Sequence, residues 1–391
     1  MTRSIHPAVT QYELWPGPAG YPWGSSGIRL WTREGILRQV APDHLICIWT
    51  TGGFSEPTEG NFTMVSRSQD DGRTWSAPEI LFRHAHRGLF TTELFVPRAG
   101  EIHAFLQTYA LCAWMTQLDS YRSISRDGGL TWSCPNSIPG GIHHGAWVNS
   151  GIVHSSGRWI IPVSWAEHCG AEWCEPSIGR PPASVVAGPG ARQPVELPWG
   201  ADKSLLYQTA NAWADRNHRY VAGVMLSDDE GATFRLRGYL CRDDARHFIE
   251  PKVVELSDGR VTLFAREKWQ GWIWRSESTD GGETWSPIQR TDIPNPSSKF
   301  RLLRANDGRI FLLHNTAGIQ PDGKWGRRSP LSLWISDDDM RTWQTKVDLI
   351  ADTERNLNYP DGFLDEERGE VRLAWEDAYS VYIAAVPMDV T

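Results

Sequence analysis

A short motif recurs along the chain and constrains its fold more than any other feature. The form Ser-x-Asp-x-Gly-x-Thr-aromatic is found at residues 68–75, 125–132, 227–234, 278–285 and, with methionine in the glycine position, 336–343. In such a turn the Asp carboxylate accepts hydrogen bonds from backbone N–H groups, and glycine takes a positive φ where the chain reverses. The aromatic residue then re-enters a strand and packs between sheets. We interpret these aspartates as turn residues, not as catalysts or metal ligands.

A second element precedes each of these motifs: two apolar runs joined by a tight turn. Such turns, most of them with glycine, occur near residues 44, 100, 157, 259, 308 and 369. Asp-Gly between apolar runs is the strongest short hairpin signal, so each repeat contains two hairpins and four antiparallel strands. Periodic four-stranded units predict the blades of a β-propeller. The chain is therefore expected to be all-β, a propeller of six blades.

The spacing of the repeats predicts one domain over residues 1–391 with a long insertion. The distance between the second and third motifs is about double the usual distance, because of a Pro-, Gly- and Ala-rich stretch at 168–218. We interpret this stretch as an insertion in the third blade; seven blades are the alternative if it forms a strand pair. The last blade lacks the motif, so the N-terminal segment is expected to supply its outer strand.

Charge and hydropathy exclude several classes of function. The formal net charge of −8 is spread along the chain without a basic block, which argues against nucleic-acid and anionic-membrane partners. The N-terminus has no apolar run of a signal peptide and no stretch reaches membrane-span length, so a cytoplasmic protein is expected. The six cysteines form no C-x-x-C pair, so no metal or other cofactor is expected. The 21 tryptophans suit sugar binding, because indole packs on a pyranose face.

The predicted blades place ionisable and aromatic side chains on one face. The two hairpin turns of a blade share one face, so the opposite face carries the other strand ends. First strands begin there near Arg33, Glu93, Trp147, Glu250, Lys299 and Tyr359, and second strands end near Trp49, Tyr109, Glu167, Arg266, His314 and Glu376. The connecting loops add His84, His86, His143, His144 and His247. A funnel with such groups is the expected ligand site, and the segment from Glu250 to Arg266 is its most specific part.

These residues and motifs resemble those of the sialidase (neuraminidase) superfamily. The resemblance implies that Glu250 polarises a tyrosine nucleophile and that Arg266 belongs to an arginine triad that binds the substrate carboxylate. Tyr359, in Asn-Tyr-Pro-Asp-Gly, lies where the family nucleophile opens the last blade. A neutral phenol suits an anionic anomeric centre because it avoids charge repulsion. The resemblance also places Glu59 at the position of the family's acid/base aspartate.

The other two arginines of the family triad have less direct counterparts. The family's N-terminal Arg-Ile-Pro motif is absent, and Arg33 or Arg38 is its substitute. For the third arginine, Arg301 and Arg304 are near the expected place.

Three functions fit these residues. The first is an exo-acting, sialidase-like glycoside hydrolase on an acidic glycan, with Tyr359, Glu250 and Glu59 as catalytic groups. The second is a lyase on a uronate-containing glycan, because histidines around the mouth resemble those of propeller lyases such as ulvan lyases. There a Tyr or His removes the C5 proton and an Arg neutralises the carboxylate; Tyr109 or one of the histidines would take the proton, with Arg266 as neutraliser. The third is a non-catalytic glycan-binding propeller.

Overall fold

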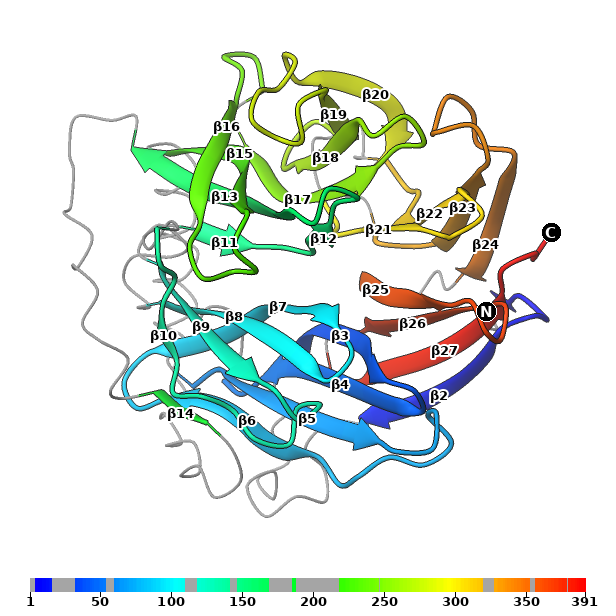
Figure 1. Ribbon diagram of the computed structural model, residues 1–391. Coiled ribbons are helices and arrows are strands. Elements are labelled where there is room, and N and C mark those ends of the chain that lie inside the picture. Colours follow the sequence, from blue (N-terminus) through cyan, green and yellow to red (C-terminus); the bar gives the residue numbers. More distant parts are fainter. Residues whose placement is uncertain are drawn as a thin grey trace, which may run out of the picture.

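Six antiparallel sheets arranged in a ring make up the protein (Figure 1). The computed structural model describes residues 4–15, 32–53, 60–109, 118–140, 146–168, 185–187, 218–245, 247–318, 327–351, 356–377 and 379–391. Within these ranges every regular element is a strand, so no helix of membrane-spanning length or hydropathy occurs there. The prediction of an all-β propeller with six blades is confirmed.

Each blade has four main strands, which run in order from the inner strand outward. Blade 1 contains β3 (Thr32–Ala41), β4 (His44–Thr51), β5 (Phe62–Ser68) and β6 (Glu79–His84), and blade 2 contains β7 (Gly88–Arg98), β8 (Glu101–Tyr109), β9 (Leu118–Ser125) and β10 (Asn136–Ser137). Blade 3 contains β11 (Ala146–Val148) and β12 (Ile152–Val153), which both pair with β13 (Trp159–His168), then β15 (His218–Ser227) and β16 (Arg235–Leu240). Blade 4 contains β17 (Phe248–Glu255), β18 (Val261–Glu267), β19 (Trp272–Ser278) and β20 (Gln289–Pro294). Blade 5 contains β21 (Arg301–Arg304), β22 (Ile310–Asn315), β23 (Leu331–Ser336) and β24 (Thr345–Ala351), and blade 6 contains β25 (Asn358–Asp365), β26 (Glu370–Glu376), β27 (Val381–Pro387) and β2 (Thr10–Trp15).

The N-terminal segment closes the ring, as the sequence predicts. Strand β2 pairs antiparallel with β27 and becomes the outer strand of blade 6. Its last residue, Trp15, is fully buried and packs on Trp49 of blade 1 with ring centroids 5.5 Å apart. The preceding strand β1 (Ser4–Ile5) adds to the outer edge of blade 5. The two N-terminal strands thus pair with two neighbouring blades, β1 with blade 5 and β2 with blade 6.

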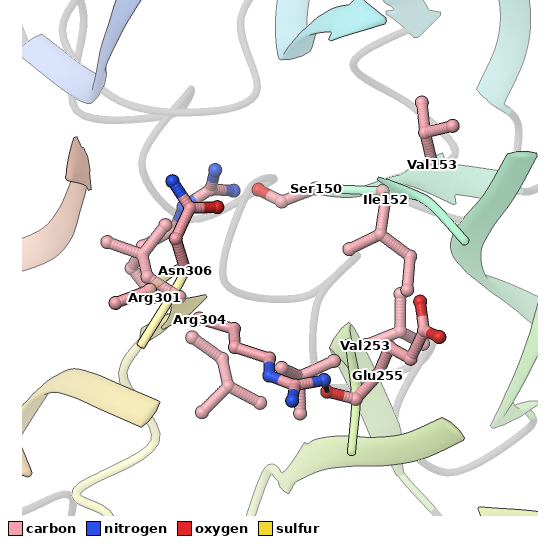
Figure 2. Close-up of a pocket in the computed structure, with 13 residues that line it drawn as sticks. Ser150, Ile152, Val153, Val253, Glu255, Arg301, Arg304 and Asn306 are labelled. Carbon is pink, nitrogen blue, oxygen red and sulfur yellow. Dashed lines mark hydrogen bonds between the residues drawn. The ribbon is translucent and has the colours of Figure 1, made fainter. Parts of the chain in front are cut away.

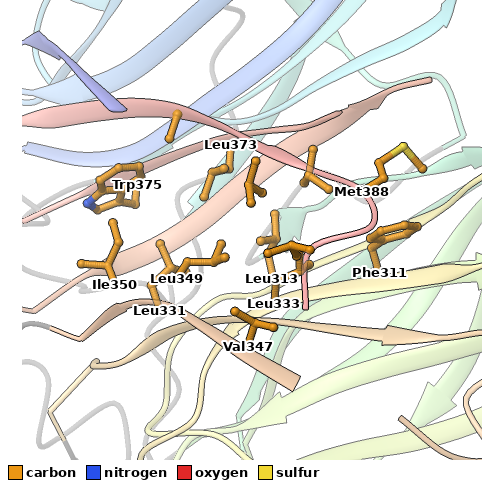
Figure 3. Packing of buried hydrophobic residues seen from close by; sticks show 14 of the residues in the cluster. Phe311, Leu313, Leu331, Leu333, Val347, Leu349, Ile350, Leu373, Trp375 and Met388 are labelled. Carbon is orange, nitrogen blue, oxygen red and sulfur yellow. The ribbon is translucent and has the colours of Figure 1, made fainter. Parts of the chain in front are cut away.

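Apolar side chains fill the space between each blade and the next. Six hydrophobic clusters each join one neighbouring pair of blades. Figure 3 shows the cluster between blades 5 and 6, where Leu313 and Leu333 face Leu373 and Trp375. Because both faces of every sheet are covered in this way, the strands read as nearly continuous apolar runs rather than as strict alternation.

The recurring turns have the local structure that the sequence predicts. In the fourth motif, Asp280 accepts hydrogen bonds from Thr284 N (2.9 Å), Thr284 Oγ1 (2.5 Å) and Ser278 Oγ (2.7 Å). The same bonds form around Asp338 in the degenerate copy, where Met340 takes a φ of 61° in place of glycine. These aspartates are fully used by their own turns, which supports their interpretation as structural residues.

The two ends of the propeller axis are distinct. The motif turns and the hairpin turns between first and second strands lie at one end, here called the rear face. The inner strands β3, β17 and β25 begin at the other end, here called the front face. Residues 185–187 of the predicted insertion form β14, which pairs with β6 at the outer edge of blade 1, so the seven-bladed alternative is wrong. Residues 169–184 and 188–217 lie outside the described residues.

We predict that the glycine of a hairpin turn contributes through its backbone conformation alone. Gly100 has a φ of 81°, and a Cβ there would meet no atom within 4 Å. Gly100→Ala should therefore lower the free energy of unfolding by about 1 kcal/mol. Gly318 is the matched control: a Cβ meets nothing there either, but its φ is not positive. Gly318→Ala should be neutral or slightly stabilising. Equal denaturation midpoints for the two variants would contradict this account.

Candidate functional site

Three arginines surround the ring of Tyr359 at the front face. The guanidinium carbons of Arg328, Arg33 and Arg266 lie 4.7, 5.5 and 5.7 Å from its ring centroid. They come from blades 5, 1 and 4, while Tyr359 lies near the start of β25 in blade 6. Within the described chain the Tyr359 hydroxyl makes no hydrogen bond, and the residue is 7% exposed. The ring closure therefore brings three other segments of the chain to one tyrosine.

Two glutamates hold two of these arginines in place. Arg33 Nη1 donates to Glu376 Oε1 at 2.8 Å, and Glu376 is fully buried. Arg266 Nη1 lies 2.8 Å from Glu250 Oε2. Both carboxylates are thereby used to fix guanidinium groups at the edge of the site.

Arg328 is held differently, by neutral acceptors. Its Nη2 donates to Ser297 O at 2.8 Å and its Nη1 to Asn358 Oδ1 at 3.2 Å. Burial lowers the pKa of Arg328, and no described carboxylate lies within ion-pair distance of it. Three guanidinium groups thus face two carboxylates at this site, which leaves a net positive charge suited to an anionic group.

Three inner strands share an unusual backbone conformation near their front ends. Glu34, Glu250 and Tyr359 have φ values of 58°, 52° and 50°, a region that non-glycine residues rarely occupy. At each place the ladder to the next strand shifts register. Such bulges re-aim side chains, and strained backbone persists where the surrounding structure holds it. Such strained residues occur at the front ends of β3, β17 and β25 as well as in turns of the rear face.

A buried charge cluster lies behind the tyrosine on the propeller axis. Arg38 donates to Glu93 Oε1 (2.6 Å) and to Asp361, and Ser150 Oγ donates to Glu93 Oε2 (2.5 Å). Burial opposes the ionisation of Asp361, but Arg38 and Arg301 outweigh it and hold the pKa of this carboxyl at about 2. These groups connect blades 1, 2, 3 and 6 through the centre of the ring.

A lysine lies in the same layer, next to this cluster. Lys252 is 1% exposed, and its Nζ donates to Asn149 Oδ1 at 2.9 Å. Burial, followed by the charge of Lys299, lowers the pKa of Lys252 to about 7. In the parts of the chain that the structure describes, no three His, Cys, Asp or Glu side chains gather in a way that would hold a metal ion.

A family comparison agrees with this architecture. The model of the BNR repeat-like domain matches residues 43–373. The chain belongs to this family of sialidase-superfamily β-propellers. Curated relatives include a sialidase of Micromonospora viridifaciens, 23% identical over 72% of the chain, and a sialidase of Clostridium perfringens, 28% identical over 30% of it. The aligned parts are 40% and 35% of those proteins, so the chain spans about two fifths or less of their length.

Solved structures share the BNR-repeat fold at low sequence identity. The Hadza microbial sialidase Hz136 superposes with a TM-score of 0.67 at 16% identity, covering 92% of this chain and 66% of that one. Trypanosoma rangeli sialidase in complex with the inhibitor DANA gives 0.65 at 14% identity, with 97% and 60% covered. A protein of unknown function from Dyadobacter fermentans gives 0.67 at 15% identity and is covered over its full length. These likenesses establish the fold.

In this BNR-repeat propeller the third arginine beside the tyrosine is one that sequence reasoning missed. Arg328 precedes β23, in the connection between the second and third strands of blade 5. Such connections open on the front face, so Arg328 could have been found by including them in the alignment of blades. Arg301, the residue predicted for this role, instead donates from Nε to Gly362 O (3.1 Å) in the axial layer. Of the three, Arg328 is the one that lies beside the tyrosine in the structure, whereas Arg301 and Arg304 do not.

Two of the predicted aromatic or imidazole groups lie together between blades 3 and 4. The half-buried Trp147 meets Tyr220 edge to face at 5.2 Å, and Tyr220 lies 5.4 Å from the His247 ring. Tyr109 lies apart from them, in blade 2. It is fully buried, and its hydroxyl donates to Asn61 Oδ1 at 2.5 Å. This buried phenol is not presented to a substrate in the structure.

Three other predicted substrate-binding residues are buried, with exposed fractions of 1% or less. His314 packs edge to face on Trp334 at 4.7 Å, and burial lowers its pKa to about 3. Glu376 anchors Arg33, and Glu93 anchors Arg38. Glu93 lies deeper than predicted because β7 begins at Gly88 and contains a register shift just before it. In the described structure the contacts of all three are therefore with other protein groups.

The remaining predicted residues lie on the periphery or outside the described residues. His84 ends β6, its Nδ1 accepts a hydrogen bond from the backbone N of the exposed His86, and burial and then Arg87 lower its pKa to about 4. Glu167 accepts hydrogen bonds from Arg219 and Tyr239 in a partly exposed network on blade 3. Glu59, His143 and His144 lie outside the described residues.

We predict that Asp361 links the axial cluster to the stability of the ring. Its pKa of about 2 lies below the unfolded value of about 3.9, so it stabilises the fold above pH ~4 and this contribution is lost as the pH falls toward 2. Asp361→Asn should lower the free energy of unfolding at neutral pH by about 3 kcal/mol, because the buried charges of Arg38 and Arg301 lose one of the two carboxylates that oppose them. Its stability should also change less between pH 4 and 2 in denaturant titrations. The exposed Asp337→Asn is the control, with an effect within about 0.5 kcal/mol.

Proposed function

We propose that this propeller is an exo-acting glycoside hydrolase for an acidic sugar, with Tyr359 as its nucleophile. The observation that carries the proposal is the set of three guanidinium groups around one tyrosine. The relatives named as sialidases support the proposal. The resemblance to their superfamily implies a tyrosine nucleophile next to an arginine triad, and Tyr359 lies among three arginines.

The arginines bind and orient the substrate. Arg33 and Arg266 are fixed by glutamates, and Arg328 has no carboxylate of its own, so a substrate carboxylate completes the charge balance. Arginine can accept such a group with two parallel hydrogen bonds. The positions of these groups are set before binding, which reduces the entropy lost when the substrate is ordered.

Tyr359 then attacks the anomeric carbon. A bond forms between its phenolic oxygen and that carbon while the glycosidic C–O bond breaks, and the phenolic proton passes to the carboxylate of Glu250. The leaving oxygen takes a proton from the acid/base group, for which Glu59 remains the prediction. Water then hydrolyses the glycosyl–tyrosine bond with that group as base, so the product retains its anomeric configuration.

We predict that Tyr359→Phe removes hydrolysis and leaves substrate binding largely intact. The change deletes the nucleophilic oxygen and keeps the ring that packs among the arginines. A panel of sialosides and uronate-containing oligosaccharides, assayed for reducing sugar, should show a fall of several orders of magnitude in kcat. Product absorbing in the ultraviolet from a C4–C5 double bond would instead identify a lyase. Binding without turnover by the unmodified protein would identify a glycan-binding propeller.

A second prediction separates Arg328 from its neighbour in sequence. Arg328→Ala should reduce kcat/KM by about ten- to a hundredfold, because one charge-assisted interaction with the carboxylate is lost. Arg327, the exposed neighbour, is the matched control, and Arg327→Ala should leave kcat/KM nearly unchanged. The effect of Arg328→Ala should also shrink on a substrate whose carboxylate is replaced by a neutral amide. Equal losses in both variants would argue against a carboxylate contact by Arg328.

A further inference from the structure

A cavity opens at the rear end of the propeller axis. It has a volume of about 480 Å³, within the range of small-molecule sites. Ser150 and Arg301 lie at its inner end, apolar side chains of Ile152 and Leu302 form its walls, and Arg304 lies toward its mouth (Figure 2). Blades 3, 4 and 5 contribute these residues, and the residues around Tyr359 are not among those that line it.

At this cavity the two terminal nitrogens of Arg301 are hydrogen-bond donors without an acceptor in the described chain. The residue is 9% exposed, and its Nε donates to Gly362 O at 3.1 Å. Neither terminal nitrogen has an acceptor among the described residues, and Nη1 is among the buried polar atoms without a partner. Because a buried donor without an acceptor is costly, and guanidinium donors can be satisfied only by acceptors, a ligand oxygen would relieve this defect.

The charges around the cavity also favour an anion. In the axial layer the two carboxylates, Glu93 and Asp361, both accept hydrogen bonds from Arg38. No described carboxylate lies within ion-pair distance of Arg301, and the neighbouring guanidinium of Arg38 has the same charge.

The mouth of the cavity carries one arginine and one carboxylate. Arg304 lies there with its Nη1 on Glu255 O at 2.9 Å. The only acidic side chain among the lining residues is Glu255, which is already bonded to Ser155 N at 2.8 Å and lies 3.5 Å from His154.

We propose that this rear cavity binds a small organic acid, with its carboxylate on Arg301 and a short apolar body against Ile152 and Leu302. The site is separate from the catalytic one. Gly362, which holds Arg301, lies three residues beyond Tyr359 on β25, or about 10 Å along the strand. Binding at the rear therefore does not depend on the proposed hydrolysis, and either can fail without the other.

Isovalerate is a suitable probe, because it has one carboxylate and a branched apolar body, and isovaleramide is its uncharged counterpart. Since the front arginines also attract carboxylates, the titration uses Arg328→Gln protein, in which one of them is removed. Calorimetry should detect binding of isovalerate and not of the amide. Adding Arg301→Gln should weaken this binding by about tenfold or more. Adding Arg260→Gln, which removes a partly exposed cation outside the cavity, should not change it.

A second variant guards against a structural effect of Arg301→Gln. Val153 lines the cavity and is 44% exposed, so Val153→Trp can occupy the mouth without entering the core. This variant, also made in the Arg328→Gln background, should lose isovalerate binding while its thermal unfolding stays close to that of its parent. The proposal is overturned if Arg328→Gln protein binds no isovalerate, if acid and amide bind equally, or if binding survives both Arg301→Gln and Val153→Trp.

Discussion

The packing of each blade against the next is the interaction on which the rest of this structure depends. No blade has a core of its own, because a single sheet buries its two faces only against its neighbours. Six apolar clusters join the six neighbouring pairs of blades, and the cluster with Trp15 and Trp49 closes the ring. A ring of this kind abolishes the open ends that a row of sheets would have. It also fixes the inner strands at the axis, where polar groups can then meet at defined distances.

Closure of the ring explains how strained residues can form a site. Glu250 and Tyr359 both have left-handed backbone conformations at bulges, and neither strand would keep such a conformation by itself. Strand β25 is held by its ladder with β26 and by the bond of Asp361 to Arg38, and β17 is held by its ladder with β18 and by the bond of Lys252 to Asn149. The packing that stabilises the propeller therefore also holds Glu250 and Tyr359 in backbone conformations that a free strand would rarely adopt.

The features that sequence reasoning predicted are those determined by short segments. The motif turns and the hairpin turn at Gly100 need only a few neighbouring residues, so the number of blades and the two faces of the propeller followed from them. Contacts across the ring were harder to predict. The prediction put Glu93 nearer the front face than it lies, because a bulge in β7 changes the register of the strand. Arg328 was missed because it lies in a connection outside the aligned strands. Counting from the turns cannot reveal either effect.

Two buried arginines along the axis lower the stability of the folded protein when no anion is bound. Arg328 at the front and Arg301 toward the rear each lack a described carboxylate partner, while the carboxylates between them are bound to Arg38. Buried cations in this situation destabilise the folded chain until an anion arrives. Under the two proposals, the binding free energy of an anion includes the relief of that cost, so each end of the axis would prefer acidic to neutral ligands. The apolar clusters between blades supply the stability that offsets the cost of burying Arg328 and Arg301 without carboxylate partners.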